Sequence, residues 1–467
     1  MKNKSIAQLG TLFVILFAIL FARQIYVQVL AGPAIAARGQ NPRHALLDQY
    51  RGRILAGDGT VLALTVKNKR VYPFGASLAH TVGYTSQRYG TAGIEDSYDS
   101  ALTPPDTTGD PIAQLFEIAA AVTGKSAQPR GADVITTLNP SIQAELSVRM
   151  QAELRGAGIV LDPRTGAVLA MSSVPSFDPN EIDALFPALS IASGSPLLNR
   201  ATSGLYAPGS TFKIVTAADG LESGIINMQS TFEDPGYFVI GNYTVHDDEG
   251  EVPGFLDLTG AFARSSNVDF AQIALKIGVA TWYEYVAKWG LGESLDFQLS
   301  AERDRIPRRD DVFPGVLAQL GFGQASLLVS PLRMALVAST IANRGITPRP
   351  YIVRQIKRDG ARSSFGAATL AQPISPETAQ NVKKMMVAVV QAGTGTAAAL
   401  PGVTVAGKTG TATNPAGKSH SWFVCFAPAQ APRVAVAIIV ENAGYGAAVA
   451  APIARNVLRV ALQAVRD

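Results

Sequence analysis

The apolar and polar positions of the chain predict one long apolar helix at its start. Residues 5–22 carry no charged side chain, and apolar sequence resumes at residues 25–30 after Arg23. A helix needs about 20 apolar residues to span a bilayer, and an arginine near its end can reach the interface. Because Lys2 and Lys4 precede it, this segment predicts a transmembrane anchor with the rest of the chain outside the cytoplasm. A cleaved signal peptide is the alternative, since small residues occur at positions 31 and 32.

Strand-like and helix-like patterns in the remaining chain predict an α+β domain. Residues 159–171 are typical of a β-hairpin with its turn at 162–166. Helical and loop-like sequence then continues for more than two hundred residues. Three further apolar runs near the end predict strands at 403–406, 421–426 and 434–440, and residues 447–465 predict a terminal helix. Strands on both sides of a helical middle indicate one mainly antiparallel sheet.

Composition narrows the class of protein. Of the 467 residues, 47% are hydrophobic and 16% charged, so a sizeable core can form and wholesale disorder is excluded. The net charge of +4 comes without a dense basic run and gives little support to nucleic-acid binding. With Cys425 as the single cysteine, in an apolar run, the chain has no intrachain disulfide and no Cys₄ or Cys₂His₂ zinc site. The four scattered histidines have no metal-ligand spacing, so we expect neither a metal site nor a Ser-His-Asp triad.

Three short motifs carry the candidate chemistry, and each occurs once. They are S-x-x-K from Ser210 to Lys213, S-x-N from Ser265 to Asn267, and K-T-G-T at residues 408–411. Taken alone, each has a structural interpretation: a helix-capping serine beside a surface lysine or an asparagine, or a polar strand end. Their occurrence together, in this order, favours a catalytic interpretation.

Ser210 is the candidate nucleophile. It follows a turn at residues 206–209 and precedes an apolar pattern that predicts a helix over 211–221. Three residues along a helix return to the same face, so Lys213 should lie beside the Ser210 hydroxyl. Since no histidine is placed as its base, Lys213 is the candidate, which requires its pKa to fall by roughly three units from near 10.4. Burial and a second cation have that effect, and we expect Lys408 to be this cation, facing the same cleft as Lys213.

The other two motifs suit substrate binding. Thr409 and Thr411 offer hydroxyl groups, and Lys408 offers a positive charge, to a carboxylate. Gly410 lets a substrate backbone approach closely, and a strand edge here can pair with an extended peptide. Ser265 and Asn267 fall at a predicted helix start.

The chain resembles the class B penicillin-binding proteins, the monofunctional peptidoglycan D,D-transpeptidases. The three motifs are also shared with serine β-lactamases. The resemblance extends to segments around the nucleophile, the K-T-G strand and the N-terminal region, namely residues 51–54, 59–63, 93–99, 162–173, 175–180, 196–200, 206–213, 321–324, 406–412 and 421–424. The short stretch between anchor and catalytic domain resembles compact, actinobacterial-type members.

The resemblance implies a role for each motif residue. Ser210 attacks the penultimate D-alanine carbonyl, and Lys213 takes its proton. Ser265 relays a proton to the leaving amine, while Asn267 positions the substrate or Lys213. Lys408 acts with them from the opposite strand.

Substrate recognition is implied in the same way. Thr409, Gly410 and Thr411 bind the substrate, with Lys408 and the two threonines holding its terminal carboxylate. The backbone N–H groups of Ser210 and Thr411 form the oxyanion hole. An amine of a neighbouring stem peptide then resolves the acyl-enzyme, and β-lactams trap the nucleophile. The reaction needs no cofactor or metal.

The implied architecture has three parts. Residues 1–30 form a cytoplasmic tip and transmembrane anchor, residues 31–145 a small non-catalytic pedestal domain of the dimerisation type, and residues 146–467 the penicillin-binding transpeptidase domain. Ala56 and Gly57 replace the acidic-basic pair of the juxtamembrane signature, so the pedestal lacks that salt bridge. The region is too small for a glycosyltransferase domain, so glycan polymerisation requires a separate membrane partner, alongside other division or elongation proteins.

Other interpretations stay open at this stage. A serine β-lactamase shares the motifs and adds rapid deacylation, a β-lactam receptor also binds covalently, and an inactive assembly scaffold needs no chemistry. Two further segments are interpreted as having no binding function. Residues 393–396 look like a fragment of a nucleotide loop without its lysine, and residues 246–251 look like a solvated acidic loop rather than a cation site.

Overall fold

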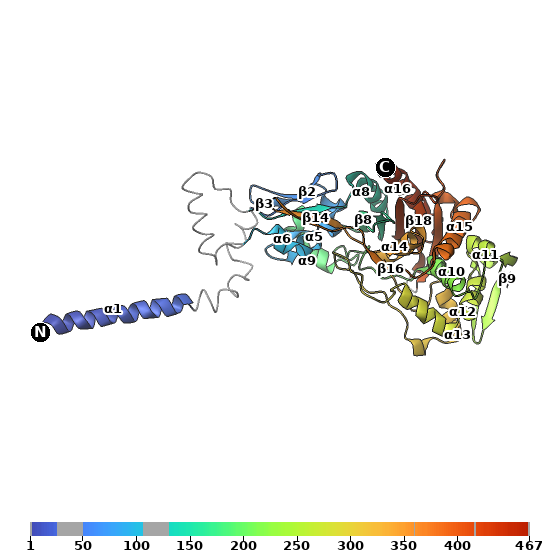
Figure 1. Ribbon diagram of the computed structural model, residues 1–467, viewed down its shortest axis with the longest axis horizontal. Coiled ribbons are helices and arrows are strands. Elements are labelled where there is room, and N and C mark those ends of the chain that lie inside the picture. Colours follow the sequence, from blue (N-terminus) through green and yellow to red (C-terminus); the bar gives the residue numbers. More distant parts are fainter. Residues whose placement is uncertain (1, 26–49, 106–129, 359, 415–416, 466–467) are drawn as a thin grey trace.

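The computed structural model describes residues 2–25, 50–105, 130–358, 360–414 and 417–465 (Figure 1). The first helix, α1 (Lys2–Ile25), covers the apolar segment at the start of the chain. Among the described residues, none of the helices combines the length and hydropathy that a membrane crossing requires. The transmembrane anchor therefore stays a prediction, and its continuation at residues 26–30 lies outside the described residues.

The catalytic part is built on a five-stranded antiparallel sheet in the order β17-β18-β19-β7-β8. The predicted hairpin is confirmed as β7 (Gly156–Leu161) and β8 (Val168–Val174), and the terminal helix as α16 (Ala450–Ala464). The three later strands are β17 (Ala406–Asn414), β18 (Gly417–Ala427) and β19 (Val434–Val440). The strand predicted at 403–406 was misplaced, because β17 begins where that prediction ended and contains the whole K-T-G-T motif.

Both faces of this sheet are covered, which explains its continuous apolar runs. Every residue of β19 is buried, and alternate side chains enter two separate cores. Val436 and Ile438 lie in the core with helices α8 (Pro140–Gln151) and α16, while Ala437 and Ile439 lie in the core with α14 (Pro331–Ala342). A strand buried on both faces loses the polar alternation that marks a half-exposed one.

A mainly helical region lies beside the sheet and carries two of the motifs (Figure 1). Its helices are α10 (Lys213–Glu222), α11 (Leu258–Arg264), α12 (Asn267–Lys288), α13 (Pro314–Gly321) and α15 (Pro376–Ala392). Two short hairpin-like pairs project from it, β9 (Thr231–Asp234) with β12 (Gly254–Asp257) and β10 (Tyr237–Ile240) with β11 (Tyr243–His246). A short helix, α9 (Ile182–Ile191), follows the first hairpin.

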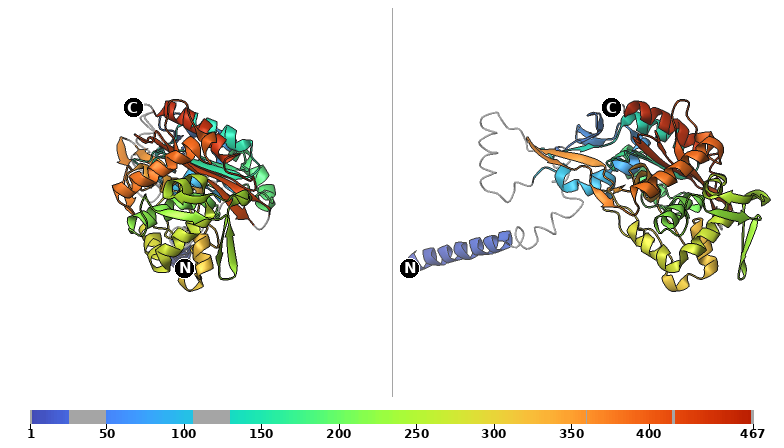
Figure 2. Two further views of the ribbon diagram at one scale, coloured as in Figure 1. Left: turned by 90° about the vertical axis from the view of Figure 1, so that its right-hand side faces the viewer. Right: turned by 45° about the vertical axis from the view of Figure 1, so that its right-hand side comes forward.

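A second sheet of six strands forms the pedestal, in the order β15-β14-β6-β1-β2-β3. Four strands come from the first 140 residues: β1 (Ile54–Leu55), β2 (Val61–Val66), β3 (Lys69–Val71) and β6 (Asp133–Thr136). The other two, β14 (Val353–Arg358) and β15 (Ala361–Ser364), come from far along the chain. Figure 2 shows this orange hairpin reaching the blue N-terminal elements. Short helices α4 (Ala79–Val82), α5 (Gly93–Ser97) and α6 (Asp99–Leu102) complete the pedestal with the pair β4 (Thr85–Ser86) and β5 (Gly90–Thr91).

These pairings cross the expected domain boundary. The β14–β15 hairpin joins the pedestal sheet through β6, although it lies within residues 146–467. Helix α8, which spans residue 146, packs on β8 and α16 of the catalytic part. The pedestal and catalytic parts are thus interleaved in sequence, and the boundaries at 30 and 145 stay predictions.

The pedestal contains a buried ion-pair group despite its lack of the expected acidic-basic pair. Nε of Arg51 and Nε of Arg70 each lie 2.7 Å from the carboxylate of Glu95, and Arg51 also contacts Asp99 at 2.7 Å. The N-terminal signature at residues 51–54 is thereby joined to the one at 93–99.

Candidate active site

The nucleophile candidate lies on a turn that is wedged between two other segments. Ser210 is half-buried in a 3₁₀ turn, Gly209–Phe212, which runs directly into α10. Gly209 has φ of +53°, and a Cβ there would lie 2.7 Å from the carbonyl oxygen of Thr411. Its N–H donates to Gly323 O at 2.9 Å. The segment at 321–324 that carries part of the resemblance therefore supports the turn from behind.

The S-x-N motif occupies the junction between two helices. Ser265 ends α11 with φ of +67°, a left-handed conformation that is uncommon for a residue with a side chain. The helix-capping serine is Ser266, whose Oγ accepts from the N–H of Asp269 at 2.9 Å. Asn267 is the first residue of α12, as the predicted helix start required. The capping role is thus filled by the middle serine, which leaves Ser265 free to contact the two lysines.

The two lysines meet at Ser265. Nζ of Lys213 donates to Ser265 O at 2.5 Å, to Asn267 Oδ1 at 2.9 Å and to Ser265 Oγ at 3.3 Å. Nζ of Lys408 donates to the same Oγ at 2.8 Å. Both lysine side chains are fully buried. The expectation that they face one cleft is confirmed, with the Ser265 hydroxyl between them.

Burial is the main cause of the unusual lysine pKa values. It lowers the pKa of Lys213 to about 7, against the charges of nearby aspartates, of which Asp247 has the largest effect in raising it. Burial also holds the pKa of Lys408 well below its usual value, and the charge of Lys213 adds to that lowering. Lys408 was expected to help depress the pKa of Lys213, but the desolvation of Lys213 itself accounts for the direction of the shift.

The K-T-G-T motif lies along β17 at the edge of the sheet. Thr411 pairs with Ser421 on β18, and Thr411 and Thr409 line the pocket that contains Ser210. A Cβ at Gly410 would lie 2.8 Å from Thr211 Cγ2 and 3.1 Å from Pro208 O. The close approach that Gly410 permits is therefore to the nucleophile's own turn, whereas the sequence suggested a substrate backbone.

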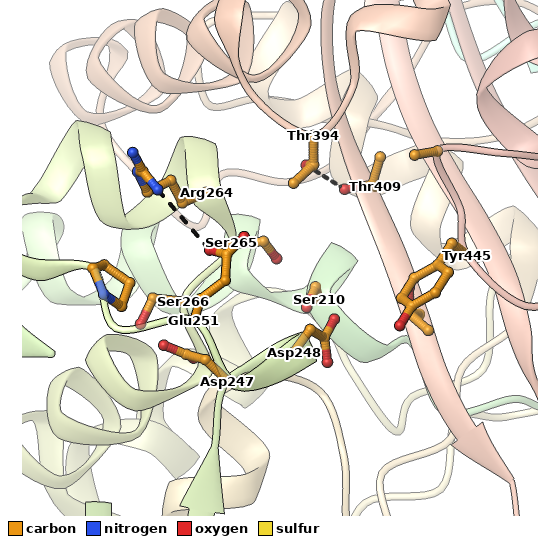
Figure 3. Close-up of a pocket in the computed structure, with 13 residues that line it drawn as sticks. Ser210, Asp247, Asp248, Glu251, Arg264, Ser265, Ser266, Thr394, Thr409 and Tyr445 are labelled. Atoms are coloured by element: carbon orange, nitrogen blue, oxygen red, sulfur yellow. Dashed lines mark hydrogen bonds and ion pairs between the residues drawn. The ribbon is translucent and has the colours of Figure 1, made fainter. Parts of the chain in front are cut away.

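Ser210 lines two cavities. Several of the other residues that line them were not predicted as site residues from the sequence. One, of about 210 Å³, is lined by Thr394 and Thr409, whose hydroxyls lie 2.6 Å apart (Figure 3). The other, of about 1020 Å³, extends toward β11 and residues 443–445. Asp247, Asp248 and Tyr445 line both cavities.

The sequence contained only weak indications that these residues belong to the site. Thr394 belongs to the Gly-Thr repeat that was set aside as a fragment of a nucleotide loop. Asp247 was assigned to a solvated loop, but it is half-buried and its Oδ1 accepts from the N–H of Asn267 at 2.6 Å. Asp248 and Glu251 of the same run are exposed, as expected. Spacing along the chain could not distinguish half-buried Asp247 from its exposed neighbours, since only the contact of Asp247 with α12 sets it apart.

The remaining candidate groups lie elsewhere. Cys425 is buried in the core, and burial raises the pKa of its thiol. His80 is bonded to Pro196 O, and burial lowers its pKa to about 4. Across the described ranges, no three His, Cys, Asp or Glu side chains are grouped so as to hold a metal ion.

The arrangement suits acyl transfer. A serine at the start of a helix faces developing negative charge favourably, because the first N–H groups of the helix are unpaired and its dipole is positive there. A buried lysine one turn further on can be neutral near pH 7 and accept a proton. The hydroxyl of Ser265 joins this lysine to a second one and can pass a proton between groups in the cleft.

Family comparisons point to the same chemistry. Residues 156–459 match the penicillin binding protein transpeptidase domain, and residues 51–134 match the penicillin binding protein A dimerisation domain. The chain is 34% identical to the peptidoglycan D,D-transpeptidase PbpA of Mycolicibacterium smegmatis and to that of Mycobacterium tuberculosis, with 99% of each chain covered.

Solved structures agree in fold. Penicillin-binding protein A of M. tuberculosis, solved as acyl-enzyme complexes with ceftriaxone, imipenem and penicillin G, is similar with a TM-score of 0.80. In the ceftriaxone complex it is 33% identical and fully covered by 89% of this chain. A D,D-transpeptidase domain from Eggerthella lenta is similar with a TM-score of 0.79 and 35% identity, covering 88% of this chain and 98% of its own.

Proposed function

The chain belongs to the class B penicillin-binding proteins and is a peptidoglycan D,D-transpeptidase, and we propose that it acts through a covalent acyl-enzyme on Ser210. One observation carries the assignment of residues. The Ser265 hydroxyl lies between Nζ of Lys213 and Nζ of Lys408, at the cleft lined by Ser210. One segment thus supplies the nucleophile and the base, a second the proton relay, and a third the second lysine, although the three are distant in sequence.

Acylation begins at Ser210. Its Oγ attacks the carbonyl carbon of the penultimate D-alanine of a stem peptide, and its proton passes to neutral Lys213. The negative charge on the carbonyl oxygen is stabilised by the backbone N–H groups of Ser210 and Thr411. Burial supports this role for Lys213, because a lysine with its ordinary pKa would be protonated near neutral pH and could not act as a base.

The leaving amine is protonated through Ser265. When the tetrahedral intermediate collapses, the C–N bond breaks and the amine of the terminal D-alanine takes a proton from the Ser265 hydroxyl, which regains one from Lys213. The contacts of Lys213 with Ser265 Oγ at 3.3 Å and with Asn267 Oδ1 at 2.9 Å support this route. Asn267 holds the amine of Lys213 in place during these transfers.

The K-T-G-T strand binds the substrate carboxylate. Thr409 and Thr411 line the cavity beside Ser210, and Lys408, buried behind them, contributes positive charge through its contact with Ser265. Gly410 brings the strand against the nucleophile's turn. An amine from a second stem peptide then attacks the acyl-enzyme, the ester bond to Ser210 breaks, and the cross-link forms. Release by water would be the carboxypeptidase variant of the same chemistry.

β-Lactams bind to the same cleft. One relative, penicillin-binding protein A of M. tuberculosis, was solved as acyl-enzyme complexes with three different β-lactams, which supports the same reaction with Ser210 of this chain. The β-lactam carbonyl takes the place of the penultimate D-alanine carbonyl, and ring opening replaces the loss of D-alanine.

Membrane location and partners complete the proposal. The apolar segment before residue 23 anchors the chain in the cytoplasmic membrane, with the catalytic part on the extracytoplasmic side. Residues 51–134 match a dimerisation domain and residues 156–459 a transpeptidase domain, and the glycan strands come from a separate membrane-embedded glycosyltransferase. The pedestal is the surface for this enzyme and for division or elongation proteins.

A fluorescent penicillin tests the proposal. Wild type and S210A are labelled side by side over time, with S190A, an exposed serine on α9, as the matched control. We expect a persistent band in wild type and S190A and none in S210A. A band that forms and clears within seconds would indicate a β-lactamase. Absence of a band in folded wild type would leave only the scaffold interpretation.

A further inference from the structure

Three aspartates from separate segments converge beneath the S-x-N motif. Asp234 ends β9, Asp247 follows β11, and Asp269 lies in the first turn of α12. Ser266 lies between them, since its Oγ donates to Asp234 Oδ2 at 2.6 Å and accepts from the N–H of Asp269. None of the three carboxylates has a part in the chemistry proposed above, but they surround the residues that do.

Asp247 holds Asn267 from another part of the chain. Its Oδ1 accepts from the N–H of Asn267 at 2.6 Å and from that of Val268 at 3.2 Å, the first two N–H groups of α12. The preceding residue, His246, accepts from Asn267 Nδ2 through its carbonyl oxygen at 3.1 Å. Both the backbone and the side chain of Asn267 are thereby fixed to β11. Because Asn267 Oδ1 accepts from Lys213 Nζ, the position of that amine depends on Asp247.

The other oxygen of Asp247 needs a proton. Among the described residues, the buried Oδ2 of Asp247 has no hydrogen-bond partner, and the neighbouring Asp234 carboxylate raises the pKa of Asp247. Two carboxylates cannot donate to each other, and two adjacent buried negative charges repel. A proton on Asp247 Oδ2 that is donated to Asp234 gives this oxygen a partner and removes the repulsion between the two negative charges. Asp269, with both oxygens buried and without a partner, adds further negative potential beside the pair.

Many charged groups face this pair. They are His246 from β11, Asp248 and Glu251 from the following loop, Arg264 from α11, Asp269 from α12 and Lys213 from α10. Asp269, which shares Ser266 with Asp234, is a buried carboxylate beside the pair, and its negative charge favours retention of a proton by the pair.

We propose that Asp247 is a positioning residue that shares one proton with Asp234, and that this acid pair holds Asn267 while limiting the negative charge beside Lys213. The inference rests on the proposed function and adds to it a control on the base. With the proton on the pair, Lys213 is neutral and can accept the proton of Ser210. With the proton moved to Lys213, the amine is charged and cannot accept the proton of Ser210.

The directions of the pKa shifts agree with this geometry. Burial, followed by the hydrogen bond with Asp234, raises the pKa of Asp247 to about 7. Burial, followed by the charges of Asp234 and Asp247, raises that of Asp269 to about 7. Among the charges that raise the pKa of Lys213, the effect of Asp247 exceeds that of Asp234. The site of the negative charge within the pair therefore sets how readily Lys213 loses its proton.

The pH dependence of acylation by a chromogenic or fluorescent β-lactam tests the shared proton. In wild type the second-order acylation rate rises with pH as Lys213 becomes neutral. D247N keeps the acceptor oxygen for Asn267 and confines the negative charge to Asp234, so we expect its rising limb to move about one pH unit toward acid. D234N leaves the charge on Asp247, nearer Lys213, so we expect a shift toward alkali. D248N removes an exposed carboxylate whose charge also raises the pKa of Lys213, so it serves as the control for simple removal of charge and should shift the rising limb toward acid.

The outcomes separate this inference from the proposed function. Opposite shifts for D247N and D234N support the shared proton. Equal acid shifts would mean two independent carboxylates, and unchanged profiles would mean no coupling to Lys213; either result overturns the inference while acylation of Ser210 stands. Absence of acylation in folded wild type would instead overturn the proposed function.

A spectroscopic measurement covers the case in which D234N does not fold. Infrared difference spectra of wild type minus D247N near neutral pH should contain the C=O stretching band of a protonated carboxyl group. Its absence would contradict the proposal. D247A should in addition lose roughly tenfold in acylation rate at every pH, since the first N–H groups of α12 lose their acceptor.

Discussion

The pedestal and the catalytic cleft each contain a group of buried charges, and of these two groups only that of the pedestal is paired. In the pedestal, Arg51 and Arg70 both contact the buried carboxylate of Glu95 at 2.7 Å. In the catalytic cleft, Lys213 and Lys408 are equally buried, but for neither lysine does the described part of the chain place a carboxylate within 4 Å. Their common contact is the neutral hydroxyl of Ser265.

The difference separates a structural use of buried charge from a reactive one. Burial alone lowers the pKa of a cation, but the charges and hydrogen bonds of Glu95 and Asp99 hold the pKa of Arg51 above its usual value. At Lys213 burial dominates and brings the pKa to about 7. A paired charge thus stabilises the fold in one protonation state, whereas an unpaired buried lysine can exchange its proton at neutral pH.

Removal of the reactive charge should have the largest effect. For Lys213→Met, we expect the acylation rate with a fluorescent penicillin to fall by roughly 10³-fold, since a general base contributes about 10²- to 10⁴-fold. Lys288→Met, which removes an exposed lysine of α12, is the control and should acylate as wild type does. A loss of less than tenfold for Lys213→Met would assign the base to another group.

Removal of the structural carboxylate should affect stability and leave the chemistry intact. Glu95→Gln leaves buried Arg70 without its counter-charge and buried Arg51 with Asp99 alone, which we expect to lower the free energy of unfolding by about 3 to 5 kcal/mol in urea denaturation. Asp133→Asn, which breaks the exposed pair with Arg53, should cost no more than about 1 kcal/mol. Molecules of Glu95→Gln that remain folded should acylate at a rate within about twofold of wild type. A tenfold slower rate would show that the pedestal controls the cleft.

The pH dependence of stability should distinguish the two groups further. The pKa of Lys213 is about 7 in the folded chain, against an ordinary lysine value of 10.5, so between these pH values the unfolded chain binds more protons. Stability then rises with pH by up to about 1.4 kcal/mol per unit from this group alone. Urea denaturation at pH 7, 8 and 9 should give a flatter dependence for Lys213→Met than for wild type. If the free energy of unfolding depended on pH in the same way for both proteins, Lys213 would have the same pKa in the folded and unfolded chain.

The smallest expected effect concerns the neutral contacts around the unpaired lysines. Thr394→Val removes the hydrogen bond to Thr409, and we expect acylation to slow by about three- to tenfold, the range of one neutral hydrogen bond. Thr396→Val, at an exposed neighbouring position, is the control. Equal rates for both variants would mean that Thr394 does not help to position the strand.

Much of the catalytic site could be predicted from short motifs. A serine and a lysine three residues apart define one turn of helix, and an apolar run defines a strand wherever its neighbours also supply apolar faces. The hairpin at 156–174 and the strand at 434–440 were found for this reason. The strand that carries Lys408 was placed too early, because its second half is polar and becomes a strand through pairing with β18.

Contacts between distant segments were beyond the reach of such patterns. The acidic run at 246–251 looked solvated because spacing along the chain does not show that α12 begins against it. The strand pair β14–β15 lies some 200 residues from the sheet that it extends. Both depend on backbone groups that find partners only after the chain has folded back on itself.

The sequence by itself determined the chemical groups: one serine, two lysines, a second serine and an asparagine in three local motifs, with the apolar runs that make a two-faced sheet. Only the tertiary structure decided their properties. It buried both lysines without a counter-ion, placed Ser265 between them in a left-handed conformation, and set Asp247 under Asn267. The physical reason is that the pKa of a group is set by its desolvation and by the charges around it, and these come from segments that meet only in the folded chain.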